Sequence, residues 1–361
     1  MHKGDKIGKY TIIKDFEVAG GMSKVSFAER SGKQYFIKEF LAPKFPIDGS
    51  PGSVATLNRK KERCNIFEAH HLKLNKAIET KCSIGGNLVF AVDFFRAGTA
   101  YYKVTEKIDI SSLLTEDIAK LKFDRILIIL KTVTHSLKIL HDLGIVHGDL
   151  KPDNILIKQT TTGAYTTKLI DFDNSYFSSL PPEDSTEIVG TPEYYSPELG
   201  SFIKNSDSIN KSDLTTKSDI FALGVIFTEY LTGKKPQFNL KYSSTWEAVS
   251  EGDVVEISGR YITDEIRVFI LSMLQKKIED RPSISQVFEK LSNKKTFSGE
   301  IVPSMLDRII TAAPPSVPEL KGKGLEFKDG KKGEFRKEVA NSKEETISKL
   351  KGKGLNIGSK K

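Results

Sequence analysis

Short runs of β-branched and aromatic residues, broken by turn residues, dominate the first 40 positions. Tyr10, Ile12 and Ile13 lead into FEVAGGMSKVSFAER and then KQYFIKEF, and the interruptions fall at Gly20-Gly21 and Ser31-Gly32. Such runs between turn signals are typical of consecutive strands. The pattern therefore predicts a small antiparallel meander.

The pattern changes after position 40. Residues 42–58 have three prolines, two glycines and no period, which predicts a loop. Residues 59–79 then carry apolar and ring side chains at steps of three and four, which predicts a helix. These side chains are Ile66, Phe67, His71, Leu74 and Ile78. The runs at 88–95 and 100–108 predict a hairpin across Arg96–Thr99.

Beyond Ile108 the helical period takes over. Residues 124–143 place six Leu, Ile and Val side chains on one face, and Gly144 follows as a helix stop. Further helices are predicted at 217–232 and 264–275. A small strand-rich half is thus followed by a larger helical half.

Composition fits one large two-lobed domain or two ordinary ones, since the chain has 361 residues of which 38% are hydrophobic. No apolar run approaches the ~20 residues of a membrane helix. The N-terminus MHKGDKIGKY lacks the apolar core of a secretory signal. The two cysteines, Cys64 and Cys82, have no zinc spacing and are expected to be reduced thiols. We therefore expect a cytoplasmic protein without membrane insertion.

The charge of +8 is concentrated near the C-terminus, where residues 301–361 hold 14 Lys and Arg against 8 Asp and Glu. This tail, 294–361, is expected to be mostly flexible, with one short helix at Met305–Ala312. It contains LKGKGL at 320–325 and 350–355. The repeat is either a chance echo or a short docking element. Without interleaved aromatic residues, nucleic-acid binding is not favoured. The basic tail is expected either to recruit an acidic partner or to occupy a groove of its own folded domain.

Five motifs follow one another in the chain. They are HGDLKPDN at 147–154, DFD at 171–173, GTPEYYSPE at 190–198, KSDIFALG at 217–224 and DRPS at 280–283. In type and order they resemble the motif set of the eukaryotic-like (Hanks-type) serine/threonine protein kinases, and GGMSKV resembles the glycine loop of many bacterial members. The resemblance implies an α+β, bilobal fold over residues 8–293. An antiparallel N-lobe with one helix (8–107) would precede a helical C-lobe (108–293).

The resemblance also implies roles for single residues. Lys38 would bind the phosphates of ATP and be held by Glu68, for which Glu62 is the rival. Asp149 would orient and deprotonate the acceptor hydroxyl, and Lys151 would neutralise the moving phosphoryl group. The implied Mg²⁺ ligands are Asn154 and Asp171. The implied nucleotide-binding residues are Val18, Gly20, Gly21, Val25, Lys38, Glu68, Glu106, Ile108 and Leu156.

Other matches are structural. Glu198 would pair with Arg281, and Asp219 would hold the backbone of the catalytic loop. His147 and Phe172 would join an apolar spine between the lobes, a role favoured over general-base catalysis by His147.

Four departures from the family pattern affect these expectations. The glycine loop keeps only its middle glycine. Phe36 stands where a small residue usually roofs the adenine, and Asp173 replaces a glycine, stiffening the loop and adding a carboxylate near the metals. Gly148 replaces an arginine that pairs with activation-segment phosphate in many members.

We therefore expect an ATP- and Mg²⁺-dependent serine/threonine protein kinase that does not strictly require activation-loop phosphorylation. A pseudokinase acting as a nucleotide-regulated scaffold is the alternative. A third hypothesis, a kinase for small-molecule alcohols or aminoglycosides, is disfavoured because those relatives generally lack a segment like GTPEYYSPE.

Overall fold

The computed structural model describes residues 1–19, 23–83, 86–108, 112–160, 163–205 and 209–293. The tail 294–361, with the helix expected at Met305–Ala312, lies outside these residues. The described part falls within one compact unit. None of its helices combines the length and apolarity that a bilayer crossing needs.

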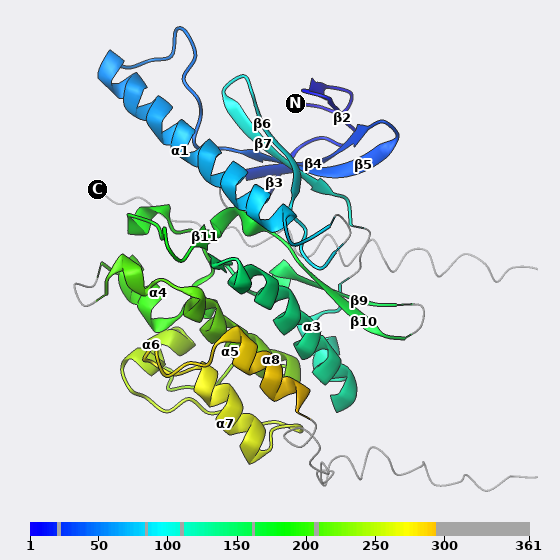
Figure 1. Ribbon diagram of the computed structural model, residues 1–361, viewed down its shortest axis with the longest axis vertical. Coiled ribbons are helices and arrows are strands. Elements are labelled where there is room, and N and C mark those ends of the chain that lie inside the picture. Colours follow the sequence, from blue (N-terminus) through cyan, green and yellow to red (C-terminus); the bar gives the residue numbers. More distant parts are fainter. Residues whose placement is uncertain (20–22, 84–85, 109–111, 161–162, 206–208, 294–361) are drawn as a thin grey trace, which may run out of the picture. The chain divides into compact units, whose positions relative to one another are not determined.

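One antiparallel sheet forms the N-terminal half (Figure 1). Its strands are β1 (Lys6–Ile7), β2 (Tyr10–Ile12), β3 (Glu17–Ala19), β4 (Ser23–Arg30), β5 (Lys33–Phe40), β6 (Ala91–Ala97) and β7 (Ala100–Glu106). The order is β1-β2-β4-β5-β7-β6, and β3 pairs with β4. Ser31 and Gly32, both with positive φ, make the tight turn between β4 and β5. The predicted meander and the hairpin across Arg96–Thr99 are both present.

Helix α1 (Val54–Glu79) lies beside this sheet and begins five residues earlier than predicted. The side chain of Ser53 caps it by accepting a hydrogen bond from the Thr56 amide. Its buried side chains, Cys64, His71, Leu74 and Ile78, all lie beyond the second turn. The first turns are therefore exposed, so they carry no apolar period, and the prediction of a loop up to residue 58 was wrong there.

The C-terminal half is mainly helical. Its helices are α2 (Thr115–Ala119), α3 (Phe123–Asp142), α4 (Pro197–Ile203), α5 (Thr216–Thr232), α6 (Thr245–Ser250), α7 (Asp264–Met273) and α8 (Ile284–Ser292). Between α3 and α4 lie β8 (Ile145–Val146), β9 (Ile155–Gln159), β10 (Tyr165–Leu169) and β11 (Tyr176–Phe177), pairing as β9 with β10 and β8 with β11. The predicted helices at 124–143, 217–232 and 264–275 match α3, α5 and α7 within two residues.

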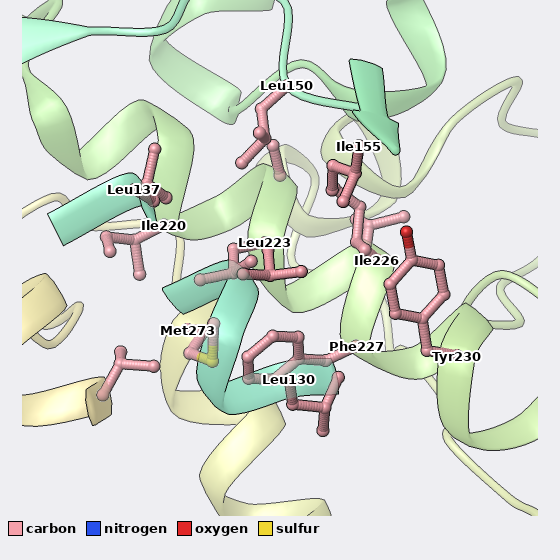
Figure 2. Close-up of a cluster of buried hydrophobic side chains, with 14 of the residues drawn as sticks. Leu130, Leu137, Leu150, Ile155, Ile220, Leu223, Ile226, Phe227, Tyr230 and Met273 are labelled. Carbon is pink, nitrogen blue, oxygen red and sulfur yellow. The ribbon is translucent and has the colours of Figure 1, made fainter. Parts of the chain in front are cut away.

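Helix α5 is the centre of this half, because its side chains are buried from Ser218 to Leu231. Figure 2 shows Leu223 and Phe227 of α5 among Leu130 of α3 and Met273 of α7. Leu150, in the loop between β8 and β9, belongs to the same buried cluster. The loop that carries the HGDLKPDN motif thus rests on the hydrophobic core of this half.

Candidate active site

Asp219, in the first turn of α5, holds the backbone of the HGDLKPDN loop. Its carboxylate accepts the amide hydrogens of His147 (2.7 Å) and Gly148 (3.2 Å) and lies 2.9 Å from His141 Nε2. Gly148 has φ +79°, and a Cβ there would lie 2.3 Å from the carbonyl oxygen of Asn174. Glycine is therefore required by the backbone path at this position.

Asp149, Lys151 and Thr191 form one hydrogen-bonded group. The Thr191 hydroxyl donates to Asp149 Oδ1 (3.0 Å), and Lys151 Nζ donates to Thr191 Oγ1 (2.7 Å). Lys151 Nζ also lies 3.1 Å from Asp149 Oδ2. The structure thus brings together the predicted carboxylate, the predicted lysine and the threonine of GTPEYYSPE. A carboxylate fixed beside an ammonium group can orient an incoming hydroxyl and accept its proton.

Asn154 and Asp171 offer oxygen atoms beside this group. The Asn154 amide nitrogen donates to the Asp149 carbonyl (2.7 Å), which leaves its Oδ1 as an acceptor. The Asp171 side chain is 37% exposed, and its backbone is left-handed, at φ +62°. An aspartate held in this sparsely populated conformation is a feature of functional sites. Carboxylate and amide oxygens are the donors that Mg²⁺ prefers, so this pair fits such an ion.

Lys38 reaches this site from β5. Its Nζ lies 3.1 and 3.3 Å from the two oxygens of Asp171 and 2.5 Å from Asp173 Oδ2. Burial alone would lower the pKa of Lys38, but the carboxylates of Asp173 and Asp171 raise it above its usual range. The ammonium group is therefore charged at neutral pH.

The structure does not bring Glu68 to Lys38. Glu68 Oε2 instead accepts the hydroxyl of Tyr101 at 3.4 Å. Among the residues with described positions, the ion-pair partners of Lys38 are Asp171 and Asp173.

The expected apolar contacts of a nucleotide lie on three strands. Val25 on β4 pairs with Lys38, while Leu156 on β9 is half-buried. Val18 on β3 is 73% exposed. Gly20 and Gly21 lie outside the described residues.

The other side of this region is polar. Glu106, at the end of β7, pairs with Lys168 Nζ at 3.3 Å, and Ile108 follows it half-buried. Phe36 shares the strand face of Lys38, two residues away, and its ring packs edge-on against Phe27 with centroids 6.0 Å apart. A phenyl ring thus occupies the face on which the adenine was expected.

The predicted structural residues are placed as follows. Arg281 binds both oxygens of Glu198, at 2.7 and 2.6 Å, with both side chains fully buried. His147 Nε2 lies 3.2 Å from the Ile170 carbonyl, and its ring packs against Phe172. Burial lowers the pKa of His147, so its imidazole is neutral at pH 7.

Sequence reasoning missed Lys103 and His70, whereas His71 was part of the predicted helical pattern. Lys103, on β7, contacts Asp173 and lies 3.5 Å from Asp171. His70 Nε2 lies 2.9 Å from the Ser175 carbonyl, and His71 is buried between Phe67 and Phe94. A lysine within the apolar run AYYKVTE was a usable signal, because a buried charge requires a partner.

The sequence of this chain is similar to the sequences of known protein kinases. The family model for the protein kinase domain matches residues 58–291. The ovarian-specific serine/threonine-protein kinase Lok of Drosophila melanogaster is 28% identical over 75% of this chain and 53% of its own length. Serine/threonine-protein kinase PSK2 of Saccharomyces cerevisiae is 28% identical over 56% of this chain and 17% of its own. Ribosomal protein S6 kinase alpha-6 of Danio rerio is 32% identical over 49% of this chain and 20% of its own length. The chain thus matches about half or less of the length of these relatives.

Proposed function

Because the chain belongs to the protein kinase domain family, we propose that it transfers the γ-phosphoryl group of ATP to serine or threonine hydroxyls of proteins. One observation carries the proposal. Lys38, from the sheet, meets Asp171 at 3.1 Å across 133 residues of sequence, beside the group formed by Asp149 and Lys151. Phosphoryl transfer depends on such positioning of charge more than on covalent chemistry.

Each charged group has a role in this proposal. Lys38 contacts the phosphates, Asp149 orients the acceptor hydroxyl and takes its proton, and Lys151 offsets negative charge on the transferred group. Asn154 and Asp171 would hold Mg²⁺, which when bound neutralises phosphate charge. Thr191 links Asp149 to the GTPEYYSPE segment, which supports a protein as the acceptor rather than a small alcohol.

The segment after Asp171 is anchored without a phosphate. The Ser175 hydroxyl donates to the His147 carbonyl at 2.9 Å, and the Ser178 amide donates to the Gly144 carbonyl at 2.8 Å. Tyr176 is buried on β11, against Gly148. These contacts support activity that does not strictly require phosphorylation of this segment.

The test is transfer of labelled phosphate from ATP with Mg²⁺ to protein acceptors. We expect Asp149→Asn and Lys38→Met to reduce kcat by at least about 100-fold, the scale of a lost acid–base or electrostatic contribution. Asp153→Asn is the matched control, because Asp153 is an exposed carboxylate of the same loop. Equal transfer by all four proteins would contradict the proposal.

A pseudokinase is the second candidate, favoured by Phe36 on the nucleotide face and by the occupation of Lys38 by two aspartates. A thermal-shift titration with ATP, combined with the transfer assay, separates the two functions. An ATP-binding protein should gain about 2.7 kcal/mol at 100 times the dissociation constant. A protein that binds Mg²⁺–ATP with this stabilisation and transfers no phosphate to any acceptor would be the scaffold.

A further inference from the structure

Lys38 and Lys103 lie directly opposite each other on β5 and β7. Like charges in this cross-strand position repel each other. The structure places the Asp173 carboxylate between them, with Oδ2 2.5 Å from Lys38 Nζ and Oδ1 in contact with Lys103 Nζ. Together with Asp171, these residues form a cluster of two ammonium and two carboxylate groups, here called the two-lysine cluster.

The two carboxylates of the two-lysine cluster differ in exposure. The side chain of Asp173 is 11% exposed, like those of Lys38 (14%) and Lys103 (10%), whereas that of Asp171 is 37% exposed. Burial alone would raise the pKa of Asp173, but Lys103 and Lys38 hold it far below its usual range. By exposure, Asp173 is the inner carboxylate of the two-lysine cluster, and Asp171 is the one within reach of solvent and solutes.

Helix α1 supplies no carboxylate to the two-lysine cluster. Its inner face carries Phe67 and His71, whose rings pack with each other and with Phe40 and Phe94. Burial lowers the pKa of His71 to about 3, so this ring is neutral at pH 7. Glu68 is engaged by Tyr101 instead.

Lys38 would lose its partner if it depended on Asp171 alone, because Asp171 is also a proposed metal ligand. Asp173 remains beside Lys38 whichever ligand Asp171 takes. Lys103 contacts the other oxygen of Asp173 and neutralises part of its charge, so that the attraction between Asp173 and Lys38 is weaker than in an isolated pair. The backbone of Asp173 is outside the left-handed region, so the side chain is accommodated without strain.

We infer that Asp173, with Lys103 as its counter-ion, is the positioning residue that holds Lys38 for nucleotide binding in place of Glu68. The inference rests on the proposed function for the role of Lys38. It assigns the position after Asp-Phe a direct electrostatic task, and it makes a lysine on β7 part of the nucleotide site.

The experiment measures binding of a fluorescent ADP with Mg²⁺ by anisotropy, the KM for ATP, and the apo melting temperature. We expect Asp173→Asn to weaken ADP binding at least about tenfold, because it removes the buried ion pair with Lys38. The KM for ATP should rise in parallel. Glu68→Gln should leave both values within about twofold, since it removes a charge that accepts only a long hydrogen bond from Tyr101.

The double variant Asp173→Asn/Lys103→Met separates positioning from simple neutralisation. Asp173→Asn leaves two buried ammonium groups facing each other, which lowers the melting temperature. Removing Lys103 as well relieves that repulsion and should restore the melting temperature. ADP affinity should stay low, because Lys38 still lacks its ion pair with Asp173.

Recovery of both stability and affinity in the double variant would overturn the inference, as would a larger effect of Glu68→Gln than of Asp173→Asn. A wild type that binds no nucleotide would overturn it too. A wild type that binds ADP but transfers no phosphate would contradict the proposed function alone. Unimpaired nucleotide binding by Asp173→Asn, in a wild type that does transfer phosphate, would contradict only the inference.

Discussion

Gly148 shows how one missing side chain can reflect geometry as well as regulation. In the sequence, this glycine replaces an arginine that pairs with a phosphate on the activation segment in many members of the family. In the structure its φ of +79° and the approach of the Asn174 carbonyl exclude any side chain. An arginine at position 148 would therefore displace the activation segment, which carries the phosphate that this arginine would bind.

We expect Gly148→Ala to lower the free energy of unfolding by more than the about 1–2 kcal/mol of a left-handed alanine, because its Cβ also meets Asn174. Activity should fall with it. Gly144→Ala is the matched control, since Gly144 has φ +68° and open space around the Cβ position. Urea denaturation of both variants measures the difference. Equal losses would show that the contact with Asn174 relaxes freely.

His71 should make stability depend on pH. Its folded pKa is about 3, lowered first by burial and further by Lys103, His70 and Lys38, and opposed by Asp173. The unfolded value is about 6.5. The unfolded chain therefore binds the extra proton between these values, so stability falls as pH decreases below about 6.5.

Replacing His71 with Phe should flatten this dependence by up to about 1.4 kcal/mol per pH unit. Phenylalanine suits the neighbouring rings of Phe40, Phe67 and Phe94. The difference in unfolding free energy between variant and wild type, measured from about pH 7 to pH 4.5, isolates the effect. Parallel curves over that range would contradict it.

At the scale of elements, the buried pair Glu198–Arg281 joins α4 to the loop before α8. Arg281 also donates to the carbonyls of Gln275, Lys217 and Lys276, and Ser218 donates to Glu198. The pair is thus satisfied on nearly every side, which is the condition under which a buried ion pair is tolerated.

Arg281→Met should lower the free energy of unfolding by about 3–5 kcal/mol, because it leaves the Glu198 carboxylate buried and unpaired. The double variant Glu198→Met/Arg281→Met should lose less than the sum of the two single variants, since the charges are then removed together. Chemical denaturation of the four proteins gives the coupling energy. Strict additivity would argue that the two side chains act independently.

Helix α1 also contacts the activation segment, through two side chains of its C-terminal half. His70 contacts the Ser175 carbonyl, and Lys73 lies over the ring of Phe177, 4.7 Å from its centroid. The position of α1 and the path of that segment are therefore coupled by direct contacts.

At the scale of the molecule, much was predictable because it depended on local patterns. The meander, the hairpin at Arg96–Thr99 and helix α3 follow from strand and helix periods. The group of Asp149 and Lys151 follows from one short motif. The partner of Lys38 was not predictable, because Asp173 and Lys103 reach it through tertiary packing across long separations in sequence.

The early start of α1 was readable only from its cap. Ser53 and Thr56 provide the N-cap, but the exposed first turns show no apolar period to accompany it. Where the first turns of a helix are stabilised by capping and propensity rather than by burial, hydrophobic patterning alone places the start of the helix too late in the sequence.

The whole molecule should be active after complete dephosphorylation, because Ser175, Tyr176 and Gly148 fix the segment without phosphate. Transfer activity before and after phosphatase treatment, with mass spectrometry of the segment, measures this. Ser185→Ala/Thr186→Ala, which removes hydroxyls near the surface, should retain activity. A dephosphorylated protein that stays inactive until this segment is modified would contradict the prediction.

Lys103 has a consequence for chemical inhibition. A compound that extends past Lys38 toward β7 would meet a buried ammonium–carboxylate pair instead of an apolar wall. Hydrocarbon substituents there would separate charges that have little access to water, at a cost in affinity. Substituents with a hydrogen-bond acceptor aimed at Lys103 would keep their affinity, so compounds selective for this protein could be designed on that single position.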